Sequence, residues 1–382
     1  MEPKSILPPA TIGMMGGGQL GRMFASAAAK MGYEVIVYCS DPGEPAAQVA
    51  HQTVIGKLDD WGAVTRFAKQ CDVITLEFEN ISAETIAKCS EFAPTYPNAN
   101  VLAVAQDRLI EKTTLSNAGL PVTPFAAVSS AETLVAVADK FGWPLIVKTA
   151  RCGYDGKGQY RVESEQQAAD VPWDSFDSWI AEQCISFDCE ASVIVARTAT
   201  GDVKCFPVFL NDHHNHILDV TTIPAALSDA LCDRACEVAV AATEALDVVG
   251  LLCVEFFVVD GDSVIINEVA PRPHNSGHLT IEALFTSQFE QHVRAVCGLP
   301  LGDTRLVSGG AAMANLLGDL WGEDGTPPDW SSVLSIPDMH LHLYGKRDAK
   351  PGRKMGHLTV RGKSADDARS KVTAARDGLR RG

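Results

Sequence analysis

Short apolar runs alternate with helix-like segments over the first hundred residues. Thr11–Met15 and Tyr33–Cys39 have the length and composition of buried strands, and between them a glycine-rich turn, Gly16–Gly21, precedes an alanine-rich helix, Arg22–Met31. The same alternation continues with a helix at Trp61–Lys69, a strand at Val73–Leu76 and a helix at Ala83–Lys88. The order predicts β-α-β connections and a small parallel, Rossmann-like α/β domain over residues 1–107.

The pattern changes at residue 108 to one that is typical of α+β structure. A helix from Arg108 is followed by predicted strands at Leu145–Lys148, Trp179–Gln183, Ala191–Arg197, Lys204–Leu210, Leu251–Val259 and Ser263–Val269. These predict a second domain over residues 108–305. Further strands at Ser308–Leu316, His340–Tyr344 and His357–Arg361, with a charged helix from Ser364, predict a small β-rich domain over residues 306–382.

Composition limits the classes of protein that fit this pattern. A chain of 382 residues with 46% hydrophobic content can bury several cores, and its net charge of −16 argues against a general nucleic-acid or anionic-membrane binder. No run of 18 uninterrupted apolar residues and no signal peptide is visible, so we expect a cytoplasmic protein. The 11 cysteines include no C-x-x-C pair, which favours reduced core thiols.

The turn Gly16-Gly17-Gly18-Gln19-Leu20-Gly21 contains G-x-G-x-x-G between a strand and a helix, where backbone N–H groups suit a phosphate. Asp41 follows at the distance at which a dinucleotide-binding site carries its acidic residue. An NAD-dependent enzyme is therefore one interpretation of this motif. A tight turn that binds no ligand is another.

A second glycine-rich stretch, Gly153–Gln159, follows the strand that ends in Lys148. Its glycines allow the backbone to fold over phosphates, and Lys148 and Lys157 can supply positive charge to phosphate oxygens. This combination predicts a mobile phosphate lid. The alternative is a solvated hairpin tip, and the Walker A pattern G-x-x-x-x-G-K-[ST] is absent.

Two glutamates on neighbouring predicted strands indicate a metal site. If Gly261-Asp262 forms a two-residue hairpin loop, Glu255 and Glu268 face each other directly, and if Asp260-Gly261 forms it they are diagonal neighbours on the same face. Paired like charges need a cation between them, and Mg²⁺ prefers one or two carboxylates together with phosphate oxygens. Asn267 is placed on the opposite side of the pleat unless the strand twists. Two glutamates on a solvated sheet face remain the alternative.

Two polar segments near the C-terminus are candidates for binding an anionic substrate. Ala270–His278 is a turn-forming loop that carries Arg272 and His274, directly after the glutamate hairpin. Lys346, Arg353 and Lys354 form a basic cluster that could hold a monophosphate. A structural loop and a solvated charge run are the corresponding alternatives.

Together these motifs resemble the 5-(carboxyamino)imidazole ribonucleotide synthetase family of ATP-grasp ligases. The resemblance rests on Gly16–Met23, Glu77-Phe78-Glu79-Asn80, Gly153–Gln159, Asn267–Arg272, His274–His278 and Pro351–His357, so it covers nearly the whole chain. It implies an ATP-grasp fold preceded by a parallel α/β pre-ATP-grasp domain and followed by a small C-terminal domain. It also implies a homodimer that uses ATP and Mg²⁺.

The resemblance assigns roles to particular residues. The ATP site would comprise Arg108, Lys148, Gly153, Tyr154, Asp155, Gly156, Lys157, Gly158, Gln159, Glu182, Gln183, Cys184, Ile185, Glu190, His213, Asn267 and Glu268. Within it, Glu182–Ile185 would meet the adenine edge, Glu190 the ribose, and Glu255 and Glu268 the magnesium. The ribonucleotide would contact Gln19, Leu20, Glu77, Tyr154, Asp155, Arg272 and His274, with its phosphate on Lys346 and Arg353.

The implied reaction carboxylates the amine of 5-aminoimidazole ribonucleotide with ATP and bicarbonate, through carboxyphosphate. Lys148 and the metal pair would neutralise the transferring phosphoryl group, and Asp155 would orient the amine or accept its proton, with Arg272 at the same centre. Other acceptors, such as that of the formate-dependent glycinamide ribonucleotide transformylase, remain open, as do the NAD-dependent enzyme and a non-catalytic nucleotide-binding protein. Histidine crowding at Asn211–His216 makes the choice of His213 less secure.

Overall fold

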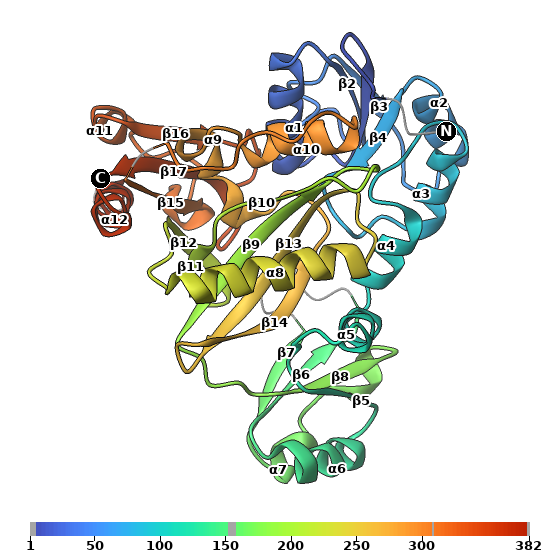
Figure 1. Cartoon of the computed structure of the whole chain (residues 1–382), viewed down its shortest axis with the longest axis vertical. Coiled ribbons are helices and arrows are strands. Elements are labelled where there is room, and N and C mark those ends of the chain that lie inside the picture. The colour runs from blue at the N-terminus through green and yellow to red at the C-terminus, as the bar shows by residue number, and fades with distance from the viewer. Residues whose placement is uncertain (1–4, 152–157, 308, 380–382) are drawn as a thin grey trace.

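The computed structural model describes residues 5–151, 158–307 and 309–379, and its strands form three sheets. The first has four strands in the order β3-β2-β1-β4, the second has nine, and the third has four in the order β5-β8-β6-β7. In Figure 1 the first sheet (blue) and the C-terminal strands of the nine-stranded sheet (red) lie above the third sheet (green), and the other strands of the nine-stranded sheet lie between them.

The N-terminal unit consists of β1 (Thr11–Met15), α1 (Gln19–Lys30), β2 (Glu34–Cys39), β3 (Gln52–Ile55), α2 (Trp61–Ala68), β4 (Val73–Leu76), α3 (Ala83–Ser90) and α4 (Ala99–Ala105). All three strand pairings are parallel, as the β-α-β pattern predicts. Helix α1 is amphipathic and buries Phe24, Ala25 and Ala28 against the sheet. It begins three residues before the predicted start at Arg22.

The smallest unit is built from α5 (Arg108–Asn117), β5 (Phe125–Val128), α6 (Ala131–Phe141), β6 (Leu145–Thr149), β7 (Gln159–Val162), α7 (Glu165–Ala168) and β8 (Trp179–Gln183). Its strands are antiparallel, and β6 lies between β7 and β8. Trp179 is its largest fully buried side chain and packs on Trp173 and Tyr160. This core holds Lys148 and Glu182 on adjacent strands.

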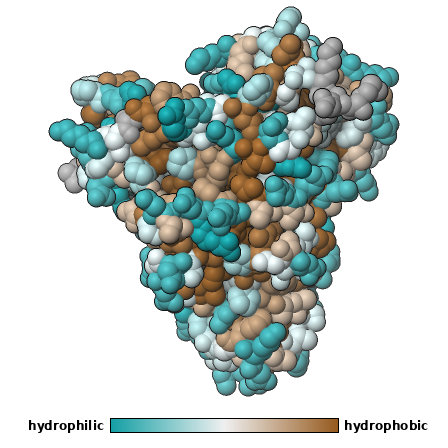
Figure 2. Space-filling model, in the orientation of Figure 1, coloured by the Kyte–Doolittle hydropathy of each residue, from teal (hydrophilic) through white to brown (hydrophobic). Residues whose placement is uncertain are grey.

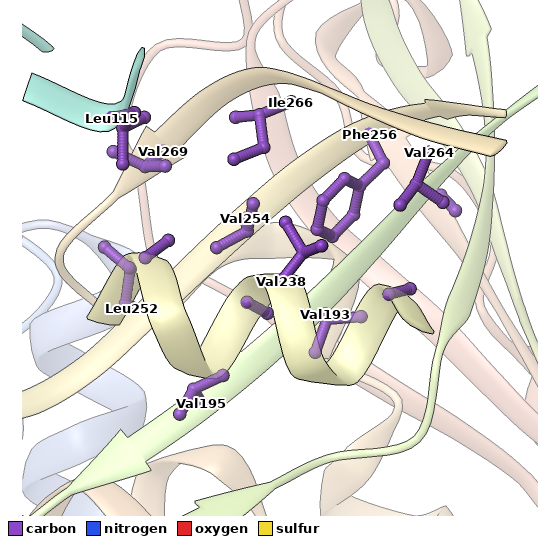
Figure 3. Packing of buried hydrophobic residues seen from close by; sticks show 14 of the residues in the cluster. Leu115, Val193, Val195, Val238, Leu252, Val254, Phe256, Val264, Ile266 and Val269 are labelled. Carbon is purple, nitrogen blue, oxygen red and sulfur yellow. The ribbon is translucent and has the colours of Figure 1, made fainter. Parts of the chain in front are cut away.

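The central sheet begins with β9 (Cys189–Arg197), β10 (Val203–Cys205), β11 (Phe209–His214), β12 (Ile217–Ile223), β13 (Gly250–Val259) and β14 (Ser263–Ala270). Helix α8 (Asp229–Ala245) covers one face, as Figures 1 and 3 show. In Figure 3 Val238 of α8 points towards Val254 and Phe256 of β13, and Leu115 of α5 lies against Val269. On the opposite face a second buried cluster covers Ile194 and Leu251, and the part that carries Glu255 and Glu268 is left for the site.

The remaining elements are α9 (Thr280–Ala283), α10 (Gln288–Val296), β15 (Gly310–Leu317), α11 (Ser331–Leu334), β16 (Met339–Leu343), β17 (Lys354–Gly362) and α12 (Ala365–Leu379). The C-terminal strands continue the central sheet, because β15 pairs with β12 on one side and with β17 on the other. Helix α10 packs on α1 and contributes Phe289 and Val293 to the N-terminal core. Strand pairing and helix packing thus tie the units together.

One predicted strand is wrong. The segment Lys204–Leu210 forms parts of two strands, because β10 ends at Cys205 and β11 begins at Phe209. Phe206 and Phe209 both enter the same buried cluster although they are three residues apart, a spacing that one regular strand cannot provide. The apolar composition predicted a strand correctly but did not show the break.

The molecular surface carries both hydrophilic and hydrophobic residues (Figure 2). On the face drawn in Figure 2 hydrophilic residues cover most of the outer edges, and hydrophobic residues gather towards the middle. Among the described residues no helix is long and apolar enough to cross a membrane.

Candidate active site

A cleft of about 930 Å³ opens between the small sheet, the uncovered face of the central sheet and the turn after β1. It collects most of the predicted site residues: Gln19, Leu20, Glu77, Arg108, Lys148, Gln159, Glu182, Gln183, Cys184, Ile185, Glu190, His213, Glu255, Asn267, Glu268, Arg272 and His274. Gly158, Lys346 and Arg353 are described but do not line it. Gly153, Tyr154, Asp155, Gly156 and Lys157 lie outside the described residues.

Glu255 and Glu268 face each other directly on β13 and β14, as predicted, but the predicted two-residue loop is wrong. Val259 pairs with Ser263, so the connection has three residues, and the pairs near it are offset by one from the predicted register. A β-bulge between Glu255 and Phe256 leaves Asn267 as an extra residue and restores the opposition of the two glutamates. The bulge also lets Asn267 line the cleft with the carboxylates.

Each of these carboxylates has a histidine or arginine side chain as a neighbour in the cleft. Glu255 Oε1 lies 2.9 Å from His274 Nε2, and Glu268 Oε2 lies 3.6 Å from an Arg108 guanidinium nitrogen. Burial would raise the pKa of Glu255, but His274 outweighs it and lowers the pKa to about 2. Glu255 is therefore ionised at neutral pH and available to a cation.

The hairpin fits magnesium when substrate phosphates supply further oxygens. Two opposed carboxylates and the buried Asn267 Oδ1, which has no hydrogen-bond partner, offer hard oxygen ligands. Among the described residues no group of three or more histidine, cysteine, aspartate or glutamate side chains could hold a metal by itself. A site with two protein carboxylates therefore requires a ligand that brings its own oxygens.

Lys148 belongs to a charge network in which two lysines contact the buried Glu182. Its Nζ lies 2.8 Å from Glu182 Oε2, and the Nζ of Lys112 lies 3.4 Å from the other oxygen of Glu182. Lys112 also donates to the backbone carbonyl of Asn267 at 2.7 Å. Burial alone would raise the pKa of Glu182, but the two lysines lower it. This network joins the small sheet to the metal hairpin and keeps the Lys148 ammonium at the cleft wall.

Glu190 and His213 meet on neighbouring strands β9 and β11. His213 Nδ1 lies 2.6 Å from Glu190 Oε2. Burial would lower the pKa of His213, but the hydrogen bond and charge of Glu190 raise it. Of the crowded histidines, His213 and His216 line the cleft. Nearby, the Phe187 and Phe257 rings stack 4.6 Å apart at 13° and provide an apolar wall.

The glycine-rich turn is filled by a side chain of the protein itself. The carboxylate of Glu77 accepts hydrogen bonds from the backbone N–H groups of Gly18 and, at 2.9 Å, of Gly21. It thereby satisfies the N-terminus of α1, which has no side-chain cap of its own, and explains the early helix start. Burial raises the pKa of Glu77. A Cβ on Gly18 would lie 2.5 Å from this carboxylate, so a larger residue there would displace the Glu77 side chain.

Arg272 is fixed by a two-pronged ion pair with Glu79, the carboxylate two residues after Glu77. Its Nε and one terminal nitrogen donate to the two oxygens of Glu79, the second at 2.9 Å. Burial would raise the pKa of Glu79, but the guanidinium lowers it to about 2. The pair joins the N-terminal unit to the loop after β14 and orients Arg272 within the cleft wall.

The basic segment places its three cations differently. Lys354 lines the cleft and helps to lower the pKa of Glu255, after the larger effects of burial, His274 and His213. Lys346 Nζ donates to the Lys354 carbonyl at 2.6 Å and lies over the Tyr344 ring. Arg353 donates to the Asp348 carbonyl at 2.8 Å. The assignment of Lys346 and Arg353 to a phosphate stays a prediction.

Comparisons with known proteins agree with this geometry. Residues 9–106 match the ribonucleotide synthetase preATP-grasp domain, residues 113–289 the ATP-grasp domain, and residues 311–371 the phosphoribosylaminoimidazole carboxylase C-terminal domain. The chain is 39% identical to the N5-carboxyaminoimidazole ribonucleotide synthase of Bacillus subtilis, over 98% of this chain and 97% of that protein. The chain belongs to this synthase family.

Two further proteins are similar to the chain, one in sequence and one in structure. The chain is 40% identical to the bifunctional purine synthesis protein purC/E of Dictyostelium discoideum, over 93% of this chain but only 37% of that protein. The crystal structure of the Aspergillus clavatus synthase in complex with ADP and 5-aminoimidazole ribonucleotide superposes with a TM-score of 0.86 at 30% identity. It covers 97% of this chain and 99% of that one. The predicted ATP-grasp fold is confirmed.

Sequence reasoning gave no site role to three residues of the cleft or its supporting network, Glu79, Lys112 and Glu111, and it placed Lys354 only in the basic cluster. Glu79 could have been found from strand alternation with Glu77, and Lys112 from its place one helical turn after Arg108 on α5. Glu111 lines the cleft, its Oε1 has no hydrogen-bond partner, and burial raises its pKa to about 8. Lys354 adjoins Arg353, but only the register of β17 shows which of the two reaches the cleft.

Proposed function

We propose that this chain uses ATP and Mg²⁺ to join bicarbonate to the exocyclic amine of 5-aminoimidazole ribonucleotide. The observation that carries the proposal is one continuous cleft that contains a carboxylate hairpin with a lysine at one end and a glycine turn with an oriented arginine at the other. Such a cleft can hold a nucleoside triphosphate and a second anionic substrate close together.

The nucleotide belongs at the hairpin end. Lys148 and Arg108 face its phosphates, and Glu255, Glu268 and the Asn267 amide oxygen hold the magnesium that neutralises phosphate charge. Cys184, Ile185 and the Phe187–Phe257 pair offer an apolar surface for adenine. Glu190, fixed by His213, is placed to accept hydrogen bonds from ribose hydroxyls.

The ribonucleotide belongs at the turn end, next to Gln19, Arg272 and His274. A bicarbonate oxygen attacks the γ-phosphorus, ADP leaves, and carboxyphosphate forms between the two substrates. The amine then attacks the carbonyl carbon, phosphate leaves, and the amine loses one proton. Lys148 stabilises the transferring phosphoryl group, and Arg272 holds the acceptor in line.

The synthase reaction is favoured over hydride transfer to or from NAD. The Gly18 and Gly21 N–H groups, which a dinucleotide phosphate would need, already donate to Glu77. Asp41 Oδ1 accepts a hydrogen bond from the Gly43 N–H at 2.6 Å and so stabilises the turn in which Asp41 lies. A cytoplasmic location and a homodimer are retained as parts of the proposal, on the resemblance to the family.

Phosphate release tests the proposed function. The purified chain is mixed with ATP, Mg²⁺, bicarbonate and 5-aminoimidazole ribonucleotide, each omitted in turn, and glycinamide ribonucleotide with formate serves as the competing pair. We expect release and a carboxylated product only with the complete first mixture. Equal release with the competing pair would overturn the proposal in favour of the transformylase, and no acceptor-dependent release would overturn both.

A further inference from the structure

The His274 ring is held at both of its nitrogens. Nε2 lies 2.9 Å from Glu255 Oε1, within the cleft. Nδ1 lies 2.9 Å from Ser276 Oγ, and the backbone N–H of Ser276 also points at Nδ1, at 3.3 Å. A backbone N–H can only donate, so Nδ1 is an acceptor and the ring proton is on Nε2.

A chain of buried polar side chains continues behind Ser276. Ser192 Oγ donates to Ser276 Oγ at 2.9 Å, Asn211 Nδ2 donates to Ser192 Oγ at 2.8 Å, and Thr221 Oγ1 donates to Asn211 Oδ1 at 3.0 Å. Ser192, Thr221 and Ser276 are fully buried and Asn211 is 5% exposed. Ser192, Asn211 and Thr221 come from neighbouring strands β9, β11 and β12. We name Ser276, Ser192, Asn211 and Thr221 the relay.

The hydrogen bonds of the relay run in one direction. Asn211 uses its oxygen to accept from Thr221 and its nitrogen to donate to Ser192, so the Ser192 proton is free for Ser276. The Ser276 hydroxyl, having accepted from Ser192, can give its own proton to His274 Nδ1. Four buried groups therefore contribute one donor to the imidazole, where the low dielectric strengthens each bond.

We propose that the relay is a positioning network for the ribonucleotide site: it fixes the plane and tautomer of His274, so that Nε2–H faces the cleft. This inference rests on the proposed function only for the identity of the ligand that His274 meets. Of the four relay residues Ser276 belongs to the loop that carries His274, and Thr221 lies three hydrogen bonds beyond Ser276. The sheet thus positions a loop residue at a distance.

Thr221→Val and Thr243→Val form a matched pair for the test. Both threonines are 0% exposed, and each hydroxyl donates one buried hydrogen bond, at 3.0 Å from Thr221 and at 2.8 Å from Thr243 to Ala239. Only Thr221 is connected to His274. Ser192→Ala and Ser276→Ala interrupt the relay closer to His274. Valine keeps the threonine shape, so we expect the two valine variants to fold.

Two readouts separate positioning from general stability. We expect Ser276→Ala to raise the Michaelis constant for 5-aminoimidazole ribonucleotide about threefold to tenfold, the usual weight of one hydrogen bond, and to raise that for ATP less, through the contact of His274 with Glu255. Ser192→Ala and Thr221→Val should follow with smaller rises. In ¹⁵N-histidine spectra of the ligand-free protein, wild type should show the Nε2–H tautomer of His274, and Ser276→Ala should disturb it.

The outcomes distinguish the two proposals. If the relay variants match Thr243→Val in both constants and leave the His274 signal unmoved, the relay proposal is overturned while the synthase activity stands. A protonated Nδ1 in the wild-type spectrum would overturn it as well. If the wild-type chain shows no ribonucleotide-dependent turnover, the proposed function fails, and the histidine spectra of the variants still decide the relay.

Discussion

The two ends of the cleft are built in different ways. At the turn end the ligand-facing groups already have partners within the protein: Glu77 caps the Gly18–Gly21 turn and Glu79 holds Arg272 with both oxygens. At the hairpin end two groups are less tightly held, since the Glu268 side chain is 44% exposed and the Asn267 amide oxygen has no hydrogen-bond partner. One end is preorganised, and the other has unused polar groups.

The difference shows where ligand binding has more to organise. Preorganised groups lose little freedom when a ligand arrives, so the turn end can bind the ribonucleotide with small rearrangement. The hairpin end needs a cation and phosphates to offset its paired carboxylates. Substitutions at the hairpin should therefore affect turnover strongly and stability little, and those at the turn end should do the reverse.

Glu268→Gln is the largest expected disruption of the hairpin end. It removes one magnesium ligand, and turnover should fall at least about a hundredfold, the scale of losing a major electrostatic contributor to the transition state. Thermal stability without nucleotide should hold or rise, because one of two facing like charges is lost. Turnover, melting temperature and magnesium-dependent nucleotide binding are compared with Glu237→Gln, an exposed glutamate on α8. Wild-type turnover at ordinary magnesium would exclude the metal pair.

Lys148→Ala should weaken ATP binding about tenfold to a hundredfold and ribonucleotide binding much less, because a charge-assisted contact to phosphate contributes about 1.5–3 kcal/mol. Lys112 stays on Glu182 and limits the loss of stability. Calorimetry with each ligand measures the split. An equal loss for both ligands would point to a folding defect and contradict the division of the cleft.

Arg353→Ala sharpens the comparison at the turn end. If its guanidinium grips the ribonucleotide phosphate, the Michaelis constant for that substrate should rise about tenfold and that for ATP should not. Arg353 must first leave the Asp348 carbonyl, so the expected rise is near the low end of the range of about tenfold to a hundredfold for a charge-assisted contact. Arg353→Lys should recover only part, since an ammonium lacks the planar fork. An unchanged ribonucleotide constant in the alanine variant removes this assignment.

Glu79→Gln should lower turnover less than the changes above, through a less firmly oriented Arg272, and should have a clear effect on stability. The pKa of Glu79 is about 2 when folded and lies near its ordinary value of 4.5 when unfolded, so its ion pair stabilises the fold above pH 4.5. That stabilisation is lost as pH falls from about 4.5 towards 2. Melting temperatures of wild type and variant should therefore converge in acid. A constant difference from pH 7 to pH 3 would contradict this role of the pair.

The sequence predicted the parallel N-terminal unit and the opposed glutamates, because both follow from local hydrophobic pattern and strand pairing. It could not predict the bulge at Asn267, where the extra residue changes the register without a glycine or proline to mark it. It also did not predict that the Glu77 carboxylate fills the turn, because Glu77 lies 59 positions after Gly18 and 56 positions after Gly21. The break between β10 and β11 was missed for a similar reason, because tertiary burial of Phe206 and Phe209 determines it.

The site residues divide in the same way. Lys148 and Arg272 were candidates from their local motifs and Glu182 was assigned from the resemblance, and the structure adds the buried partners that orient them, Lys112 and Glu79. The relay behind His274 was outside the reach of sequence reasoning, because Ser192, Asn211 and Thr221 are ordinary strand residues until the sheet brings them together.

Isotope transfer from bicarbonate to phosphate tests the central claim most directly. Bicarbonate labelled with ¹⁸O is supplied with ATP, Mg²⁺ and 5-aminoimidazole ribonucleotide, and the phosphate released in early turnover is analysed by mass spectrometry. Attack of a bicarbonate oxygen on the γ-phosphorus predicts one ¹⁸O atom in each phosphate. Phosphate without label, released at the same rate, would show that water or another oxygen attacks ATP, and it would contradict the proposed activation of bicarbonate in this cleft.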